Sequence, residues 1–147
     1  MALNSREGHR AEIGHRLSAA LKAVNEEIHR RLVASGYPDI RVGHGALFAH
    51  VEPGGTSVTE LARRAGMTKQ SMGELAADLE SRGYVERVAH PGDRRARMVR
   101  LTKRGDTHVA HARQVIDELE GEYARALGVE RFAELGRLLE ELSSDRA

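Results

Sequence analysis

Two short helices are expected in close succession over residues 57–84. Ser57 and Glu60 have the spacing of a capping box, in which the Ser57 hydroxyl and the Glu60 carboxylate each accept a hydrogen bond from the other residue's backbone N–H. The first helix should therefore begin directly after Ser57. Gly66 suits the left-handed residue that follows a helix end, and Thr68 suits the N-cap of the next helix. Two helices joined by a tight turn that contains glycine are typical of a helix-turn-helix.

The second of these helices separates into an apolar and a polar face. Its apolar residues recur at the i, i+3, i+4, i+7 spacing of a buried stripe, namely Met72, Leu75, Ala76 and Leu79. Off that stripe, the first turns carry hydrogen-bonding side chains, namely Lys69, Gln70, Ser71 and Glu74. This composition suits a helix whose first turn faces base edges in the major groove of DNA. An ordinary solvated helix face has the same composition, so this helix alone leaves both interpretations open.

A β-hairpin with a basic tip is expected to follow the two helices. Tyr84–Val88 and Ala96–Leu101 alternate in polarity, and residues 90–93, with the sequence His-Pro-Gly-Asp, have the composition of a turn. Arg94 and Arg95 lie at or beside the tip of this hairpin. A hairpin directly after a helix-turn-helix makes a winged helix, and such a wing can place an arginine in the narrow, electronegative minor groove.

Short motifs follow one another in a characteristic order over residues 57–105. They are Leu61-Ala62, Met67-Thr68, Leu79-Glu80, Gly83-Tyr84-Val85, Asp93-Arg94-Arg95, Leu101-Thr102 and Gly105. In this order they resemble the MarR family of bacterial transcriptional regulators. The Asp-x-Arg of the wing, followed by Leu-Thr-x-x-Gly, is the most distinctive part. The resemblance implies an obligate dimer, a palindromic DNA site and, usually, a small anionic or phenolic ligand that releases the DNA.

Long amphipathic helices are expected on both sides of this stretch. From about Arg10 to Ala34 the apolar residues step by three or four, namely Ile13, Leu17, Leu21, Val24, Ile28 and Leu32. Further helices are expected over residues 41–51, 103–127 and 130–142, and the last carries Phe132, Leu135, Leu138, Leu139 and Leu142 on one face. The first helix could cover its own domain. Pairing with a second copy explains both terminal stripes better, and it presents two recognition helices one DNA turn, roughly 34 Å, apart.

These elements predict a mainly α chain with a small β-hairpin wing. The expected fold is a winged helix-turn-helix with N- and C-terminal dimerisation helices, built as one domain overall. Residues 1–36 are expected to form the N-terminal dimerisation helix, with residues 1–8 frayed. Residues 41–102 are expected to form the DNA-binding region, and residues 103–147 the C-terminal linker and dimerisation helices.

The net charge of the chain is small, but its positive charge is concentrated in the middle of the sequence. The formal net charge is only +1, yet residues 57–104 hold eleven Lys or Arg against six Asp or Glu, whereas residues 105–147 hold five against ten. This asymmetry places the expected nucleic-acid face on the helix-turn-helix and the wing. No apolar run approaches the ~18 residues of a membrane span, and no signal-peptide segment begins the chain. We therefore expect a cytoplasmic protein without membrane association.

Metal and enzyme chemistry are not favoured by the sequence. The chain has no cysteine, no Gly-rich phosphate loop and no GxSxG motif, so neither an enzyme nor a cofactor is expected. His108 and His111 share one face of an expected helix. A zinc-sensing branch of the resembled family uses a histidine near the second helix and a histidine pair on the fifth, which makes His44, His108 and His111 the alternative metal ligands. That branch spaces its pair by four residues rather than three, and we favour scattered histidines without a metal.

An effector pocket is implied only by the resemblance. The family would place it between the first two helices and the long fifth helix. Tyr37, His44 and Phe48 are the candidates to line it.

We assign DNA contacts to the start of the second short helix and to the wing. The predicted contact residues are Thr68, Lys69, Gln70, Ser71, Glu74, Arg94, Arg95 and Arg97. Asp93 is expected to hold the wing arginine, because a carboxylate against phosphate would be repelled. The predicted function is a sequence-specific DNA-binding transcriptional regulator, a ligand-responsive repressor that binds a palindromic operator as a homodimer. The alternatives are a zinc-sensing regulator of the same fold and a winged-helix protein-interaction module without DNA binding.

Overall fold

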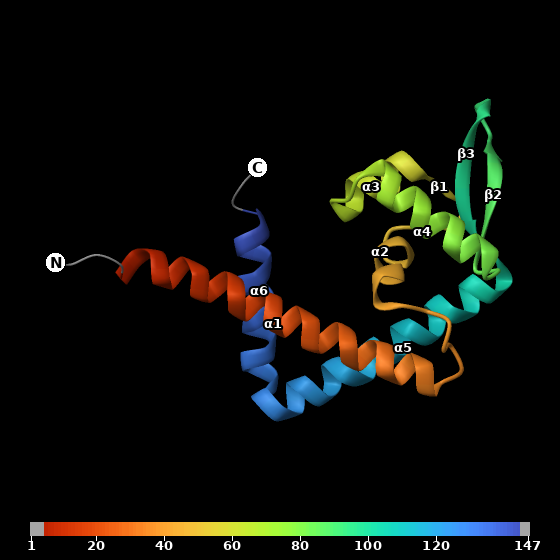
Figure 1. Ribbon diagram of the computed structural model, residues 1–147. Coiled ribbons are helices and arrows are strands. Elements are labelled where there is room, and N and C mark those ends of the chain that lie inside the picture. The colour runs from red at the N-terminus through yellow and green to blue at the C-terminus, as the bar shows by residue number, and fades with distance from the viewer. Residues whose placement is uncertain (1–4, 145–147) are drawn as a thin grey trace.

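Helices dominate the computed structural model, which describes residues 5–144, with side chains from residue 12 onward (Figure 1). The helices are α1 (Ser5–Ala34), the 3-10 helix η1 (Val42–His44), α2 (Gly45–Phe48), α3 (Val58–Ala65), α4 (Lys69–Ser81), α5 (Lys103–Leu127) and α6 (Val129–Ser144). The strands are β1 (Thr56–Ser57), β2 (Val85–His90) and β3 (Asp93–Leu101). The expected class, mainly α with a small β wing in a winged helix-turn-helix, is confirmed.

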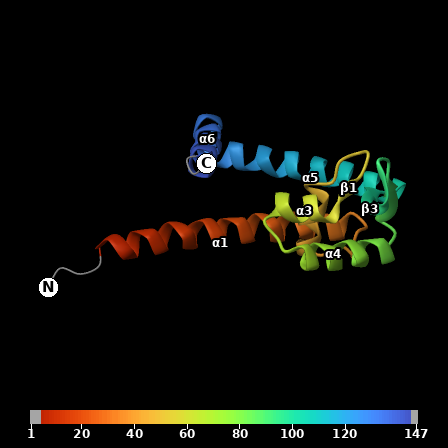
Figure 2. The ribbon, with the colours of Figure 1, turned by 90° about the horizontal axis from the view of Figure 1, so that it is seen from above.

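The elements divide into a globular part and long helical arms. The short helices and the sheet gather at one end of the molecule, while α1 and α5 extend away from them and α6 follows at the far end of α5 (Figures 1 and 2). Leu32 of α1 is buried, as are Val115 and Leu119 of α5. The two arms are also joined by an ion pair between Arg31 and Glu122, with 2.7 Å between Nη2 and Oε2.

The helix-turn-helix forms where the capping signals predict it. The backbone N–H of Glu60 donates to the Ser57 hydroxyl at 3.2 Å, and Gly66 adopts a left-handed φ of +64° after α3. The backbone N–H of Ser71 donates to the Thr68 hydroxyl at 3.1 Å, which caps α4. The reciprocal half of the expected capping box is replaced, because the Glu60 carboxylate accepts hydrogen bonds from the guanidinium groups of Arg63 and Arg64.

The sheet has one strand more than the sequence indicates. Its order is β1-β3-β2, antiparallel throughout, and Thr56 of β1 pairs with Val99 of β3. A strand of two residues leaves no alternation in the sequence, so β1 could not be predicted. The hairpin is confirmed, but β3 begins at Asp93 rather than at Ala96, because His90 and Asp93 pair directly across the connection. The wing is therefore longer than predicted.

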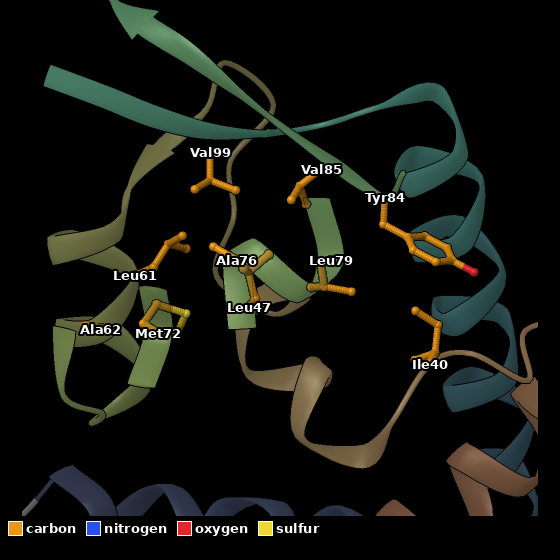
Figure 3. Packing of buried hydrophobic residues seen from close by; sticks show 10 residues of the cluster. All are labelled: Ile40, Leu47, Leu61, Ala62, Met72, Ala76, Leu79, Tyr84, Val85 and Val99. Carbon is orange, nitrogen blue, oxygen red and sulfur yellow. The ribbon is translucent and has the colours of Figure 1, made fainter. Parts of the chain in front are cut away.

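One apolar cluster holds the globular part together. Figure 3 shows Val85 and Val99 of the sheet facing the helices that carry most of the cluster, while Ile40 and Tyr84 come from connecting segments. Its buried members are Ile40, Leu47, Leu61, Ala62, Met72, Ala76, Leu79, Tyr84, Val85 and Val99. The predicted stripe of α4 is confirmed: three of its four residues are fully buried and Leu75 packs against them.

The segment before the helix-turn-helix and the chain ends differ from expectation. A single helix over residues 41–51 was expected, with Val42 inward, but η1 and the short α2 take its place and Val42 is 47% exposed. The 3-10 winding turns Val42 away from the core while Leu47 stays buried. α1 begins at Ser5 instead of near residue 10, so the expected fraying of residues 1–8 is wrong for residues 5–8, while residues 1–4 lie outside the described part of the chain. No helix among the described residues is long and apolar enough to cross a membrane.

Gly105 permits a close approach between α5 and the start of β2. The carbonyl oxygen of Tyr84 accepts a hydrogen bond from the backbone N–H of Thr102 at 3.0 Å. The Thr102 hydroxyl caps α5 by accepting a hydrogen bond from the backbone N–H of Gly105 at 3.1 Å. A Cβ added at Gly105 would overlap the Tyr84 carbonyl oxygen, which is backbone and cannot rotate away. This glycine therefore fixes how the wing meets the arm.

We expect Gly105→Ala to destabilise the protein by roughly 1–3 kcal/mol, the range for overpacking a buried site. Gly45→Ala is the matched control, because Gly45 has a right-handed φ of −56° and nothing lies within 4 Å of an added Cβ. Urea unfolding followed by circular dichroism measures both variants. If the Gly105→Ala variant were as stable as Gly45→Ala, the contact between α5 and the start of β2 would be loose enough to accept a methyl group.

Candidate nucleic-acid interface

The first turns of α4 present polar side chains to solvent. Lys69, Gln70, Ser71 and Glu74 are all exposed on α4, and the capping residue Thr68 is exposed beside them. The side-chain amide of Gln70 donates one long hydrogen bond, 3.4 Å from its Nε2 to Oε1 of Glu74. An amide held so weakly is free to exchange this partner for a base edge. The N-terminus of a helix also carries partial positive charge, which favours a nearby phosphate.

Three exposed arginines lie on the outer half of the wing. Arg94, Arg95 and Arg97 are exposed, and within residues 12–144 none of them forms an ion pair. The arginines nearer the base of the hairpin are neutralised instead: Arg87 pairs with Glu80 at 3.2 Å, and Arg100 with Glu86 at 2.7 Å. Positive charge is therefore left uncompensated at the part of the wing that projects beyond the helices (Figure 1).

Asp93 holds the wing through the backbone. Its Oδ1 accepts a hydrogen bond from the backbone N–H of Arg95 at 2.9 Å. An aspartate that accepts from the N–H two residues on is typical of an Asx-turn, which fixes the local chain direction. The side chain of Asp93 thus orients the main chain that carries Arg95, while no ion pair between Asp93 and a guanidinium is found among the described residues.

Two of the three effector-pocket candidates pack against His108, which the sequence indicates only as an alternative metal ligand. His108 of α5 is 2% exposed, and its ring centroid lies 4.7 Å from that of Tyr37 and 4.6 Å from that of Phe48. The ring of Tyr84 lies 5.6 Å away. His44, the third candidate, is also buried. Tyr37 and Phe48 thus both pack against His108 where the α1–α2 region meets α5.

His108 is buried as a neutral group. Burial lowers its pKa from the ordinary 6.5 to about 4, with smaller opposing influence from the Asp39 carboxylate. Its Nδ1 is buried and has no hydrogen-bond partner among the residues that the structure describes. A buried nitrogen without a partner is energetically unfavourable, and a ligand group that satisfied it would gain from doing so.

The alternative metal ligands do not form a metal site. Among the described residues, no three or more His, Cys, Asp or Glu side chains come together in a way that could hold a metal ion. Both ring nitrogens of His44 are engaged: Nδ1 accepts from the backbone N–H of Arg41 at 2.9 Å, and Nε2 lies 2.7 Å from Oδ2 of Asp78. The geometry therefore gives the zinc alternative no support.

A polar network behind α4 was not found by sequence reasoning. His44 and Arg82 both bind Asp78, and these hydrogen bonds, that of His44 foremost, lower the pKa of the Asp78 carboxyl below its ordinary value. Asp39 binds Tyr84 and Arg104: the Tyr84 hydroxyl donates to Oδ1 at 2.8 Å, and Arg104 donates to Oδ2 at 3.0 Å. These residues are far apart in sequence and have no shared periodicity, so the sequence gives no signal for their contact.

The comparisons with known proteins agree with this geometry. Residues 44–96 match the profile described as MarR family. The HTH-type transcriptional repressor Rv2887 of Mycobacterium tuberculosis is 34% identical over 91 residues, which is 62% of this chain and 66% of that repressor. The match thus spans slightly less than two thirds of the relative's length.

Solved structures of similar shape include complexes with DNA. The transcriptional repressor CouR bound to a 23-mer DNA duplex has a TM-score of 0.75 at 24% identity, covering 97% of this chain and 99% of that one. A mutant MarR from E. coli complexed with operator DNA also has a TM-score of 0.75, at 20% identity, covering 89% and 93%. PcaV from Streptomyces coelicolor, in complex with its natural ligand, has a TM-score of 0.71 at 20% identity, covering 97% of each chain. At these identities the likeness shows a shared fold.

We predict that His108 makes the protein less stable as the pH falls from 7 to 5. Because the folded-state pKa is about 4 and the unfolded value 6.5, the unfolded chain takes up the proton first, so stability is lost from about pH 6.5 downward. The expected loss at pH 5 is about 2 kcal/mol relative to pH 7, from one pKa unit being 1.36 kcal/mol.

Urea unfolding at pH 7 and pH 5 measures this effect, with His108→Phe as the comparison because Phe keeps a ring and cannot titrate. The carboxylates Glu27 and Glu60, with pKa values near 2 through hydrogen bonds to neighbouring arginines, titrate below this window. Equal losses in the two proteins between pH 7 and pH 5 would show that His108 is not buried as a neutral group.

Proposed function

Because the chain belongs to the MarR family of winged helix-turn-helix proteins, we propose that it is a sequence-specific DNA-binding transcriptional regulator. The observation that carries the proposal is the division of charge on the wing. Arginines near its base are paired with glutamates, whereas Arg94, Arg95 and Arg97 are exposed and, over the described chain, without ion pairs. Exposed like charges repel one another, and a polyanion such as DNA would neutralise all three.

In this proposal α4 supplies the base contacts and the wing supplies affinity. Gln70 can donate and accept at once, as bidentate pairing with adenine requires, and Lys69 can bind guanine or phosphate. Glu74 could accept from cytosine if α4 enters the groove deeply enough, and Thr68 and Ser71 stand at the helix start where phosphates lie. The wing arginines would enter the flanking minor groove, with Asp93 keeping the chain of Arg95 in place.

The proposed regulator works as a homodimer on a palindromic site. Seven apolar side chains of α1 and α6 are between 42% and 63% exposed in the single chain, namely Ile13, Leu17, Leu21, Leu135, Leu138, Leu139 and Leu142. Apolar surface of this extent normally marks an interface. A second copy offers the same faces and would place two α4 helices about one DNA turn apart. A monomer mass of 16.2 kDa in solution would remove this part of the proposal.

The division of labour along the chain follows from this dimer. Residues 1–36 and 103–147 serve as dimerisation and linker helices, and residues 41–102 as the DNA-binding region. We also propose a small-molecule effector, which would bind near His108, where Tyr37 and Phe48 each pack against its ring. Repression is the proposed mode because the similar Rv2887 is named a transcriptional repressor. Among similar structures, PcaV is described with its natural ligand and CouR with p-coumaroyl-CoA.

A winged helix that binds another protein is the remaining alternative. Such a module needs no row of unpaired arginines on one projecting hairpin. Its affinity for a partner would also lack the steep dependence on salt that follows from releasing counterions from DNA.

We expect Gln70→Ala and Arg95→Ala to weaken DNA binding in different ways. Gln70→Ala should relax the preference at one base pair per half-site, at roughly 1–3 kcal/mol against the preferred base, because base edges specify sequence. Arg95→Ala should weaken binding to the preferred and to unrelated DNA alike, and it should flatten the dependence of log affinity on log salt if a phosphate contact is lost. Competition binding at several salt concentrations, on DNA selected from a random pool, separates the two effects.

Arg100→Ala is the matched control for the wing, because Arg100 lies on the same strand but is already paired with Glu86. It should change affinity less than Arg95→Ala does. If Arg95→Ala left affinity for every DNA unchanged, the wing would have no part in DNA binding. If Gln70→Ala then also kept the full base preference, the proposed DNA interface would have to be abandoned.

A further inference from the structure

The short linker between α1 and α2 touches both the recognition helix and the start of α5. Over residues 37–44 it supplies the Asp39 carboxylate, the Asp39 backbone carbonyl and the His44 imidazole to three separate hydrogen-bonded contacts. Two of these contacts reach Asp78 and Arg82 at the C-terminal end of α4. None of these residues belongs to the proposed DNA-contact set, so their contacts require a different explanation.

His44 is the most enclosed part of this linker. Its side chain is about 2% exposed, and both nitrogens have partners. Because Nδ1 accepts from the backbone N–H of Arg41, the proton of a neutral imidazole lies on Nε2, which donates to Oδ2 of Asp78 at 2.7 Å. The ring is thus held at one end by its own linker and directs one hydrogen bond to α4.

Asp78 and Arg82 together fix the end of α4. Asp78 Oδ1 accepts from Nε of Arg82 at 3.1 Å, and Nη1 of Arg82 donates to the Asp39 carbonyl oxygen at 2.9 Å. The linker therefore binds the end of α4 at two points. One is the His44 side chain, and the other is the backbone carbonyl of Asp39.

The linker also binds α5, through the side chain of Asp39. The Asp39 carboxylate accepts from Arg104 at 3.0 Å and from the Tyr84 hydroxyl at 2.8 Å, and the Arg104 guanidinium carbon lies 4.4 Å above the Tyr84 ring centroid. Since α5 continues into the proposed dimerisation arm, the linker connects that arm to the helix that is proposed to read DNA. The linker is therefore hydrogen-bonded both to α4 and to the start of α5.

Hydrogen bonds are needed to fix the orientation of α4, because its apolar contacts are not directional. Burial of Met72, Ala76 and Leu79 fixes which face of α4 points inward, but hydrophobic burial depends on area and allows small tilts and rotations. Hydrogen bonds have preferred angles, and a binding site must be held to within about 0.5 Å and 10–20° to be productive. The pair between His44 and Asp78 supplies such an angular restraint at the end of α4 opposite to Gln70.

We propose that His44 is a positioning residue for sequence recognition, acting through Asp78 to set the angle of α4 on DNA. This inference rests on the proposed function. Loss of the hydrogen bond leaves α4 folded and the basic surface intact, so binding to unrelated DNA is unchanged. Selectivity falls, because the base contacts of α4 in the two half-sites depend on its angle, whereas phosphate contacts tolerate displacement.

Two substitutions of His44 separate the hydrogen bond from simple packing. His44→Phe keeps a buried ring and removes the bond to Asp78, whereas His44→Gln loses the ring and keeps an N–H donor. We measure dissociation constants for DNA selected by the wild-type protein and for random DNA, at a temperature where circular dichroism shows each variant folded. His44→Phe should lower the ratio of specific to random affinity about tenfold, the size of losing one good base contact. His44→Gln should stay within about threefold of the wild type, a loss well below that of one base contact.

Asp78 provides the second arm of the test. Asp78→Asn keeps an acceptor for Nε2 and should retain most of the selectivity, while Asp78→Leu should lose at least as much as His44→Phe, because it also removes the hydrogen bond from Arg82. The double variant His44→Phe with Asp78→Leu should lose about as much as Asp78→Leu alone and clearly less than the two single losses together, since each single variant already lacks the hydrogen bond between His44 and Asp78. The two single variants of Asp78 do not depend on whether His44→Phe folds.

The outcomes distinguish this inference from the proposed function. If the wild type selects no sequence from a random pool, the proposed function fails and the inference fails with it. If the wild type is selective and His44→Phe or Asp78→Leu, when folded, keeps its full selectivity, only the inference is overturned. Additive losses in the double variant would also overturn it, because the two residues would then act separately.

Discussion

The burial of one face of α4 is the constraint on which the rest of the molecule depends. Met72, Ala76 and Leu79 lie against Leu61 of α3 and the valines of the sheet, so the opposite face with Gln70 has no alternative but to face solvent. Area burial of about 25 cal/mol per Å² makes this seating strong but not directional. The capping hydroxyls of Ser57 and Thr68 then fix where the two helices begin, and the hydrogen bonds behind α4 fix its angle. The proposed DNA interface is the consequence of these restraints acting together.

The parts of the fold with local signals could be predicted from the sequence. Caps, helix-ending glycines and the apolar stripe of α4 act over a few residues, so Thr68, Gly66 and Met72 stand in the structure where their spacing indicates. The hairpin was found for the same reason. Its start was placed too late, because the pairing of His90 with Asp93 depends on contacts between strands rather than on the polarity of neighbouring residues. The inward placement of Val42 failed for a related reason: one tighter turn of backbone redirects a side chain without changing the pattern of residue types.

The parts that depend on distant contacts could not be predicted. His44 and Asp78 are 34 residues apart and meet only after the core has formed, and Asp39 and Arg104 are 65 apart. Among the proposed site residues, the sequence could place Arg94, Arg95 and Arg97 on the wing, but it could not show that their neighbours Arg87 and Arg100 are already neutralised. That difference separates the half of the hairpin that is proposed to face DNA from the half in which the arginines are paired with glutamates. Likewise, His108 was noticed for its spacing from His111, whereas its burial among Tyr37, Phe48 and Tyr84 required the fold.

The central claim is that two copies of α4 and its wing bind one DNA site. Chemical footprinting of the wild-type protein on the DNA it selects from a random pool tests this claim most directly. We predict two symmetric half-sites with centres about 10–10.5 base pairs apart, or a multiple of that spacing, each protected in the major groove. Flanking each half-site, protection should extend into the minor groove where Arg95 and its neighbours would lie. A single asymmetric patch, or protection that ignores sequence, would contradict it.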